Sequence, residues 1–275
     1  MTVDGPTSPG GGLDAGAGAG AGEHPAASRA AGTSSCATGN QAAGTSHAAP
    51  GPGRPHTGCP RAHAGISGER TGRAGKHPVP VLTVLASGSG TTFQAVADAI
   101  ADGALPWRIN VLAVDRPGTG AAARAAAAGI PVRLIDRAQY RGPTRSQGLS
   151  QALSQAIPQE TDVVLLAGFL SIITEPLLTR FHRRMINLHP ALLPEFGGAG
   201  MYGRRVHEAV LAAGRTQTGC TVHYVDAGTD TGEIMLHRRI PVLPDDTPDS
   251  LATRLRPVEH RAVIDALLTL APEVR

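Results

Sequence analysis

The chain contains 275 residues, enough for one large domain or two small ones with a sizeable core, and its formal net charge at pH 7 is +3. No run of about 18 apolar residues predicts a membrane span, and roughly the first thirty residues lack the basic start and apolar core of a secretory signal. The three cysteines, Cys36, Cys59 and Cys220, form no CxxC pair, which argues against a disulfide framework and a zinc site and fits a reducing cytoplasm.

Residues 1–78 differ in composition from the rest of the chain. They contain no aromatic residue, and their only large aliphatic residues are Val3, Leu13 and Ile66. Because such a segment cannot bury enough apolar surface to offset its chain entropy, we expect a disordered tail over 1–78 and a folded domain over 79–275. The tail holds six of the 25 basic and four of the 22 acidic residues, so the folded part is close to neutral. The alkaline pI therefore does not indicate nucleic-acid binding, and the tail lacks the aromatic residues that stack on bases.

The folded part begins with a strand and a glycine turn that favour an anion site. Residues 80–86 form a continuous apolar run, typical of a strand buried on both faces. Ser-Gly-Ser-Gly-Thr-Thr-Phe-Gln follows over 87–94, and helical periodicity over 95–101. A strand, a glycine turn and a helix N-terminus bring free N–H groups and the helix dipole together, which suits a phosphate. A tight turn that needs glycine for positive φ is the alternative, and Phe93 stands where the dinucleotide fingerprint has its third glycine.

Strands and helices then alternate along the chain. Strands are expected over 108–115, 131–135, 162–169 and 185–188, followed by two more over 218–225 and 233–242. Helices are expected over 118–129, 144–157, part of 172–182, 204–213 and 249–270. The alternation implies right-handed crossovers and a parallel sheet with the 162–169 strand at its centre. We therefore predict an α/β fold: a Rossmann-like, open, mostly parallel twisted sheet with flanking helices and an antiparallel C-terminal extension.

The stretch 186–194, Ile-Asn-Leu-His-Pro-Ala-Leu-Leu-Pro, places two polar residues in an apolar run. Side chains two apart in a strand share a face, so Asn187 and His189 are expected to point the same way. Pro190 has no N–H to donate and ends the strand at its carboxyl end, which borders the ligand crevice of an open parallel sheet. An amide beside an imidazole suits a reaction in which a carbonyl oxygen gains negative charge while protons move. A buried pair that bonds only to nearby backbone is the alternative.

Other catalytic chemistries lack the necessary spacing. His207-Glu208 has no second His in the HExxH register, so no metal is expected, and Gly88-Ser89-Gly90 misses the Gly-x-Ser-x-Gly elbow. An acid remains in the glycine-containing loop over 226–232, where Asp230 is placed to reach His189 and to raise the pKa of its imidazole. A turn without chemical function is the alternative for this loop.

Five motifs in order carry a family resemblance. They are Ser87-Gly-x-Gly-Thr-x-x-Gln94, Leu166-Ala-Gly-Phe169, Ile186-Asn-x-His-Pro-Ala-Leu-Leu-Pro194, Gly219-x-Thr-Val-His223 and Asp230-x-Gly232. In sequence and spacing they resemble phosphoribosylglycinamide formyltransferase of de novo purine synthesis, over about residues 81–270. One such motif is weak, but five in register are specific. The resemblance implies the formyltransferase fold and an enzyme that transfers the formyl group of 10-formyltetrahydrofolate to the amine of glycinamide ribonucleotide.

The resemblance also implies roles by position. The catalytic residues would be Asn187, His189 and Asp230. The glycinamide ribonucleotide would be held by Gly90, Thr91, Thr92 and Glu259. The folate would be bound by Arg145, Leu170, Ser171, Ile172, Ile173 and Asn187, of which Arg145 rests on spacing in a divergent stretch. Three departures put substrate affinity in question: Thr92 stands where the family often has Asn, Ser171 stands where a larger residue is common, and the loop over 196–203 is longer than in some members.

The expected mechanism is direct formyl transfer. Asn187 and a protonated His189 would stabilise the oxyanion, and Asp230 would keep His189 charged and relay protons through water. His223 shares a strand face with Thr221 and either lines the cleft or packs as a structural residue. The expected partners are the two small-molecule substrates, without metal, nucleic acid or membrane, and the protein is expected to be a monomer or homodimer in the cytoplasm.

Related activities are the competing interpretations. Formyltetrahydrofolate deformylase resembles the same core, but usually carries a folded regulatory domain where this chain has its low-complexity tail. Methionyl-tRNA and sugar-amine formyltransferases add a C-terminal domain for which little chain remains after residue 270. A catalytically silent folate- or nucleotide-binding protein is the non-enzyme alternative, which the intact Asn187, His189 and Asp230 disfavour.

Overall fold

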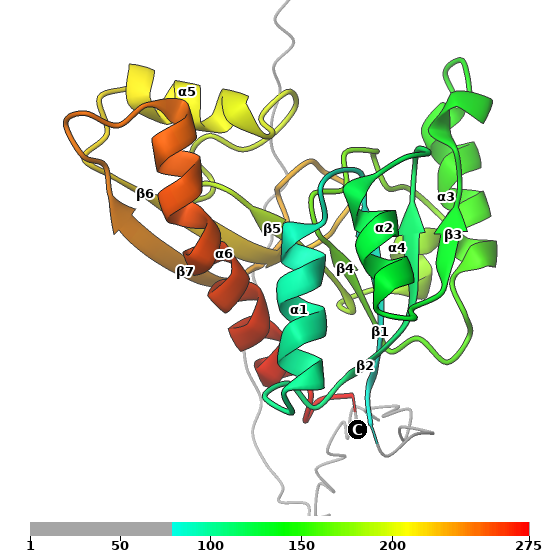
Figure 1. The fold of residues 1–275 in the computed structure, drawn as a ribbon. Helices are drawn as coiled ribbons and strands as arrows, with labels where there is room; N and C mark the ends of the chain where they lie inside the picture. Colours follow the sequence, from blue (N-terminus) through cyan, green and yellow to red (C-terminus); the bar gives the residue numbers. More distant parts are fainter. Residues whose placement is uncertain (1–78, 275) are drawn as a thin grey trace, which may run out of the picture. The chain divides into compact units, whose positions relative to one another are not determined.

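The computed structural model describes residues 79–274, and the tail expected over 1–78 lies outside the described residues. Within this range the strands are β1 (Val81–Ala86), β2 (Arg108–Val114), β3 (Val132–Leu134), β4 (Val163–Leu166), β5 (Met185–His189), β6 (Gln217–Tyr224) and β7 (Ile234–Pro241). They form one sheet in the order β3-β2-β1-β4-β5-β6-β7 (Figure 1). Strands β1 to β5 are parallel, whereas β6 and β7 each pair antiparallel with the strand before them. The predicted α/β fold is confirmed, with β4 at the centre.

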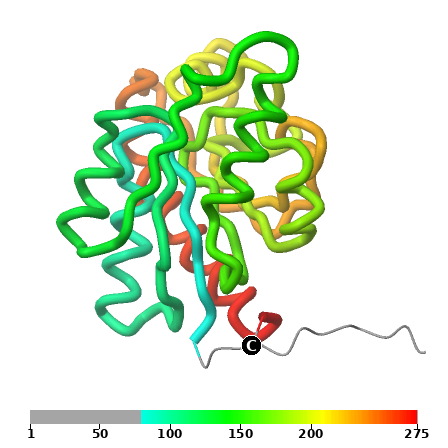
Figure 2. Tube along the Cα trace, turned by 90° about the vertical axis from the view of Figure 1, so that its right-hand side faces the viewer, coloured from blue at the N-terminus to red at the C-terminus, as the bar shows by residue number. Residues whose placement is uncertain are grey.

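Helices cover both faces of the sheet. They are α1 (Thr91–Ala101), α2 (Gly120–Ala127), α3 (Arg145–Ala156), α4 (Leu177–Arg180), α5 (Arg204–Ala212) and α6 (Pro248–Leu270). Alternate residues of a strand point to opposite faces, so Val84 of β1 packs with α1, α2 and α6, whereas Leu85 packs with α3 and α4. Figure 2 shows helical layers on either side of the strands. Burial on both faces explains why β1 is apolar throughout.

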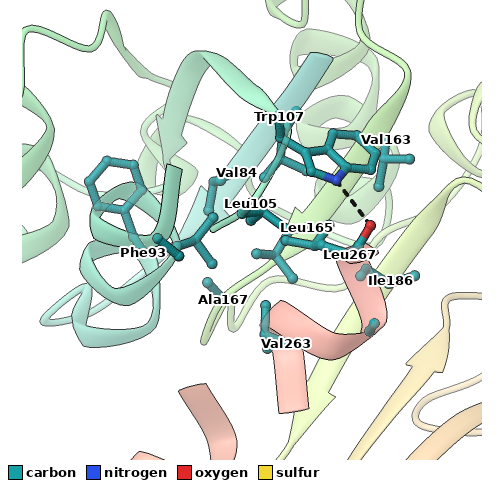
Figure 3. Packing of buried hydrophobic residues seen from close by; sticks show 14 of the residues in the cluster. Val84, Phe93, Leu105, Trp107, Val163, Leu165, Ala167, Ile186, Val263 and Leu267 are labelled. Carbon is teal, nitrogen blue, oxygen red and sulfur yellow. Dashed lines mark hydrogen bonds between the residues drawn. The ribbon is translucent and has the colours of Figure 1, made fainter. Parts of the chain in front are cut away.

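The long C-terminal helix is fixed to the first face by packing and by one hydrogen bond. The indole Nε1 of Trp107 donates to the carbonyl of Leu267 at 3.0 Å, and both side chains are buried. Val263 of α6 and Phe93 of α1 belong to the same buried cluster as Leu165 of β4 (Figure 3). The helix starts at a capping box in which Thr247 accepts from the N–H of Ser250. No helix among residues 79–274 combines the length and apolar character that crossing a membrane requires.

Two element boundaries differ by three residues or more from the sequence expectation, and glycine explains both. Helix α1 begins at Thr91 rather than at residue 95, because Gly90 takes a left-handed N-cap conformation with φ of 75° and its carbonyl accepts from Gln94 N–H. Strand β4 ends at Leu166 rather than at residue 169, because Gly168 has φ of 67° and leaves the ladder. A short turn over 87–90 therefore follows the carboxyl end of β1, and irregular backbone follows the carboxyl end of β4.

Strand β5 joins the parallel and the antiparallel parts of the sheet. It pairs with β4 on one side, where Leu166 faces Asn187, and with β6 on the other, where Asn187 faces His223. Its carboxyl end therefore lies at the same sheet edge as the ends of β1 and β4.

Candidate active site

The polar face at the end of β5 is extended by β6. Residues directly opposite in an antiparallel pair share a face, and the register pairs Asn187 with His223 and His189 with Thr221. Thr221 turns its hydroxyl to the chain after β5, donating to the carbonyl of Ala191 at 2.7 Å. The other three side chains line one cavity. The two strands thus present an amide and two imidazoles to the same space.

Asp230 completes this group from the loop between β6 and β7. Its Oδ2 lies 3.4 Å from Nδ1 of His189, and its Oδ1 lies 3.4 Å from Nδ2 of Asn187 and 3.6 Å from Nε2 of His223. The N–H of Gly198 donates to Oδ2 at 3.0 Å, and Asp230 itself has φ of 58°. The structure therefore brings the three predicted catalytic side chains together, while their catalytic role stays a prediction.

Burial decides the protonation of His189. It lowers the pKa of this imidazole, and the opposing effects of Asp230 and of the Phe196 carbonyl, 2.8 Å from Nε2, do not restore it. Desolvation of a residue that is only 3% exposed is the larger effect; Asp230 does raise the pKa of His189 as expected, but the net shift is downward, and the expected protonated His189 is not what this shift favours. The 3.4 Å separation from Asp230 is also longer than a charge-assisted hydrogen bond of about 2.8 Å. The direction of this shift favours the neutral imidazole at rest.

Asp230, by contrast, keeps its negative charge. Burial raises the pKa of this carboxyl, but the nearby imidazoles of His223 and His189 and the Gly198 N–H together hold the pKa below its ordinary value. The carboxylate is only partly exposed, at 11% of its side chain. The site therefore holds a fixed negative charge beside two imidazoles.

His223 orients the amide of Asn187. Its Nδ1 donates to the carbonyl of Tyr224 at 2.8 Å, so in the neutral ring Nε2 has no proton and accepts from Nδ2 of Asn187 at 3.1 Å. His223 lines the cavity and also holds a neighbour in place, so both sequence interpretations of this residue apply.

The cavity has a volume of about 540 Å³ and extends from the polar group toward helices α1 and α6 and toward the chain after β4. Of the residues named from the sequence, those that line it are Thr92, Leu170, Ser171, Ile172, Ile173, Asn187, His189, Asp230 and Glu259. Gly90 and Thr91 lie one step outside its lining, and Arg145 is exposed at the first turn of α3, away from it. The binding roles of these residues stay predictions.

The glycine turn at the cavity is held by its neighbours. A Cβ on Gly90 would lie 2.5 Å from Cα of Ala121, so helix α2 packs against bare backbone there. Ser87 accepts the N–H of Leu170 at 2.9 Å, which ties the turn to the chain after β4. Arg124 donates to the carbonyl of Ser89 at 3.0 Å. The N-terminus of α1 thus has a fixed backbone with Ser89 and Thr92 on the cavity side, and its use as an anion site stays a prediction.

On the other side of the turn, the chain after β4 is apolar at its surface. Leu170 is 41% and Ile172 50% exposed, and Ser171 donates to Oδ2 of the buried Asp115 at 2.6 Å. Such exposed aliphatic residues at a cavity mouth suit a flat aromatic ligand. The small Ser171 side chain therefore serves to fix this segment to the end of β2.

Sequence reasoning did not assign several residues of the cavity lining to the site, among them Arg256, His207 and Tyr202. Arg256 lies one helical turn before Glu259 on α6, a spacing that predicts a shared face once Glu259 is singled out. His207 of α5 and Tyr202 in the preceding loop reach the cavity only because α5 packs against α6. Nothing in the local sequence signals that packing.

Comparison with known proteins identifies what the chain is similar to. A family model described as formyl transferase matches residues 81–267. A protein of Mycobacterium tuberculosis named phosphoribosylglycinamide formyltransferase is 40% identical over 190 residues, covering 69% of this chain and 84% of the relative. Chloroplastic proteins of the same name from Vigna unguiculata and Arabidopsis thaliana are 39% and 37% identical over 194 residues, and the chain spans only 61% and 65% of their lengths.

Solved structures agree with the sequence matches. Glycinamide ribonucleotide transformylase 1 from Symbiobacterium toebii is similar with a TM-score of 0.62 and 36% identity, covering 69% of this chain and 86% of that one. A phosphoribosylglycinamide formyltransferase from Coxiella burnetii, in complex with CHES, gives a TM-score of 0.64 and 32% identity, with coverage of 70% and 88%.

Proposed function

The chain belongs to the formyl transferase family, and from that premise we propose that it transfers the formyl group of 10-formyltetrahydrofolate to the amine of glycinamide ribonucleotide in de novo purine synthesis. The products would be N-formylglycinamide ribonucleotide and tetrahydrofolate. The observation that carries the proposal is the meeting of Asn187, His189 and Asp230 in a cavity that also reaches the N-terminus of α1. Glycinamide ribonucleotide has a phosphate and a distant amine. Its phosphate would match the N-terminus of α1, and its amine would match the group formed by Asn187, His189 and Asp230.

The walls of the cavity suggest where each substrate binds. The phosphate would bind at the N-terminus of α1, where Gly90, Thr91 and Thr92 supply N–H groups and hydroxyls and Arg256 supplies a positive charge. Glu259 would accept a hydrogen bond from the same substrate. The folate would lie against the segment from Leu170 to Ile173, with Arg145 serving its outer end.

Formyl transfer requires one proton to move from the attacking nitrogen to the leaving nitrogen. The neutral amine attacks the formyl carbon, a C–N bond forms, and the carbonyl oxygen becomes an oxyanion. Of the two N–H groups of Asn187, the one directed at Asp230 spans 3.4 Å and is the weaker bond, so it is the one free to turn to the oxyanion. When the carbon–nitrogen bond to folate breaks, N10 takes the proton that the amine has lost.

His189 and Asp230 would relay this proton. The imidazole is neutral at rest, so it is able to take up a proton as charge develops beside it, and the fixed charge of Asp230 stabilises the imidazolium that forms. This differs from the sequence expectation of a permanently charged His189. The relay ends at N10 of folate, directly or through water.

The cellular setting stays a prediction. A cytoplasmic location is proposed from the sequence alone, and the two plant relatives are named as chloroplastic. A monomer or homodimer acting on small molecules is likewise the expectation for this enzyme.

A spectrophotometric assay tests the proposed function. The protein is mixed with 10-formyltetrahydrofolate and either glycinamide ribonucleotide, another primary amine or water alone. We expect tetrahydrofolate to form only with glycinamide ribonucleotide, and His189→Ala to lower kcat about 100-fold while both substrates still bind. Release of formate without an amine would instead indicate a deformylase, and binding without turnover a silent folate- or nucleotide-binding protein.

A further inference from the structure

A second buried histidine lines the cavity without a role in the chemistry above. His207 lies on α5, is 5% exposed, and lines the cavity. Helix α5 packs against α6, which carries Ala252, Arg256 and Glu259 in the same cavity wall. The proximity of His189 also contributes to a lowered pKa of His207. It therefore lies near both the α6 wall and the reacting group.

The ring of His207 makes no hydrogen bond to any residue within 79–274. Its Nδ1 is buried without a partner, which leaves Nε2 as the ring nitrogen accessible from the cavity. A buried polar group without a partner is unfavourable, and Leu would fill the same space at lower cost. The packing of α5 therefore does not explain why an imidazole stands here. A hydrogen bond between the accessible Nε2 and a ligand in the cavity would explain the imidazole and offset this cost.

The charge state of His207 indicates which chemical groups of a ligand it would bind. Burial lowers the pKa of this imidazole, Asp249 opposes the shift and His189 adds to it. A neutral imidazole offers one donor and one acceptor and makes its best bonds with hydroxyl and amide groups. The phosphate has its own place at the N-terminus of α1.

We propose that Nε2 of His207 hydrogen-bonds the uncharged middle of the amine substrate, a ribose hydroxyl or the adjoining amide, between its phosphate and its reacting amine. The assignment rests on the proposed function, because it takes the cavity beside α6 as the nucleotide end. His207 then acts as a binding residue that sets the position of the amine relative to Asn187 and Asp230.

Two variants at this position separate binding from packing. His207→Leu keeps the volume and removes the polar nitrogens, whereas His207→Gln retains an amide group near the position of Nε2. We expect His207→Leu to raise KM for glycinamide ribonucleotide about tenfold, the effect of one lost hydrogen bond, with KM for 10-formyltetrahydrofolate unchanged. We expect His207→Gln to restore most of the affinity. His182→Leu, at an exposed histidine outside the cavity, serves as the control.

A spectroscopic measurement makes the result independent of turnover. In protein labelled with ¹⁵N-histidine, the Nε2 signal that is missing from His207→Gln identifies this ring. We expect that signal to move when glycinamide ribonucleotide is added and to stay in place when 10-formyltetrahydrofolate is added alone.

The outcomes distinguish this proposal from the proposed function. If the wild-type protein formylates glycinamide ribonucleotide, and His207→Leu has the wild-type KM with no movement of the Nε2 signal, only the assignment of His207 is overturned. Equal rises of both KM values in His207→Leu and His207→Gln, with a lowered Tm, would also overturn it in favour of a packing role. If the wild-type protein does not formylate this substrate, the proposed function itself fails.

Discussion

The loop that carries Asp230 and the stretch of α6 that carries Glu259 both line the cavity, yet they impose opposite behaviour on a carboxyl group. Around Asp230, two histidines and a backbone N–H hold the pKa below its ordinary value despite burial. Around Glu259, burial raises the pKa from 4.5 to about 7, and Arg256 offsets only part of this effect. One carboxyl is therefore a fixed charge, and the other titrates near neutral pH.

The difference follows from hydrogen bonding rather than from burial. Asp230 accepts from the N–H of Gly198 and the amide of Asn187 and faces His189, so its charged form is stabilised directly. Glu259 forms no hydrogen bond to any described residue, and exposed Arg256 is the one charge that favours its ionised form. A fixed charge at the reacting end suits proton transfer, whereas an unsatisfied carboxyl at the nucleotide end suits a group that a hydroxyl of the substrate will satisfy.

Removal of the fixed charge should have the largest effect. Asp230→Asn replaces a carboxylate by an amide of the same shape, so the imidazolium formed at His189 loses its stabilising partner. We expect kcat in steady-state assays to fall by about 100-fold, with smaller changes in either KM. Asp245→Asn, at an exposed aspartate outside the cavity, should leave kcat unchanged. A kcat within about threefold of wild type would show that the charge of Asp230 is not used in the reaction.

The ionisation of Glu259 should change the free energy of unfolding as pH changes, rather than the catalytic rate. Because its pKa is raised in the folded protein from 4.5 to about 7, the folded state binds this proton more tightly than the unfolded state. The group has no effect on stability below pH 4.5, its cost grows as pH rises from 4.5 to about 7, and the full cost is present above 7. Between pH 5.5 and 8 this amounts to a loss of about 2 kcal/mol in the free energy of unfolding.

Glu259→Gln should remove that dependence. Urea unfolding at pH 5.5 and at pH 8 measures this dependence. We expect the free energy of unfolding of the variant, relative to that of wild type, to rise by about 2 kcal/mol between the two pH values. Glu273→Gln, at an exposed glutamate, controls for the loss of a negative charge. If wild type and Glu259→Gln changed in parallel with pH, Glu259 would ionise normally and the contrast with Asp230 would be lost.

The two regions also differ in how far the sequence predicted them. The positions of Asn187 and His189 could be predicted from the local sequence. Period-two alternation places both residues on one face of a strand, and Pro190 ends that strand. The position of Asp230 required the motif order of the family. The protonation of His189 was predicted in the wrong direction, because desolvation depends on all the chain that packs over a side chain and not on its nearest charge.

The proposed nucleotide end of the cavity depends on packing between distant elements. His207 and Arg256 line the cavity because α5 and α6 pack together, and contact between separate helices leaves no local pattern in the sequence. Arg145, assigned to the folate from spacing in a divergent stretch, lies outside the cavity lining, and its role stays a prediction. The start of α1 at Thr91 depends on the left-handed conformation of Gly90, which composition alone does not determine.

The smallest expected effect lies at the phosphate end, where Thr92 stands in place of the Asn common in the family. The hydroxyl of Thr92 offers one donor at the N-terminus of α1, whereas an Asn amide would offer two N–H groups to a phosphate. We expect Thr92→Asn to lower KM for glycinamide ribonucleotide about threefold in steady-state assays, with kcat unchanged, because the phosphate binds equally in the ground and transition states. Thr92→Val, which removes the hydroxyl, should raise the same KM. Since a phosphate is bound chiefly by backbone N–H groups and the helix dipole, larger changes in either variant would mean that side chains dominate this end of the cavity as they do around Asp230.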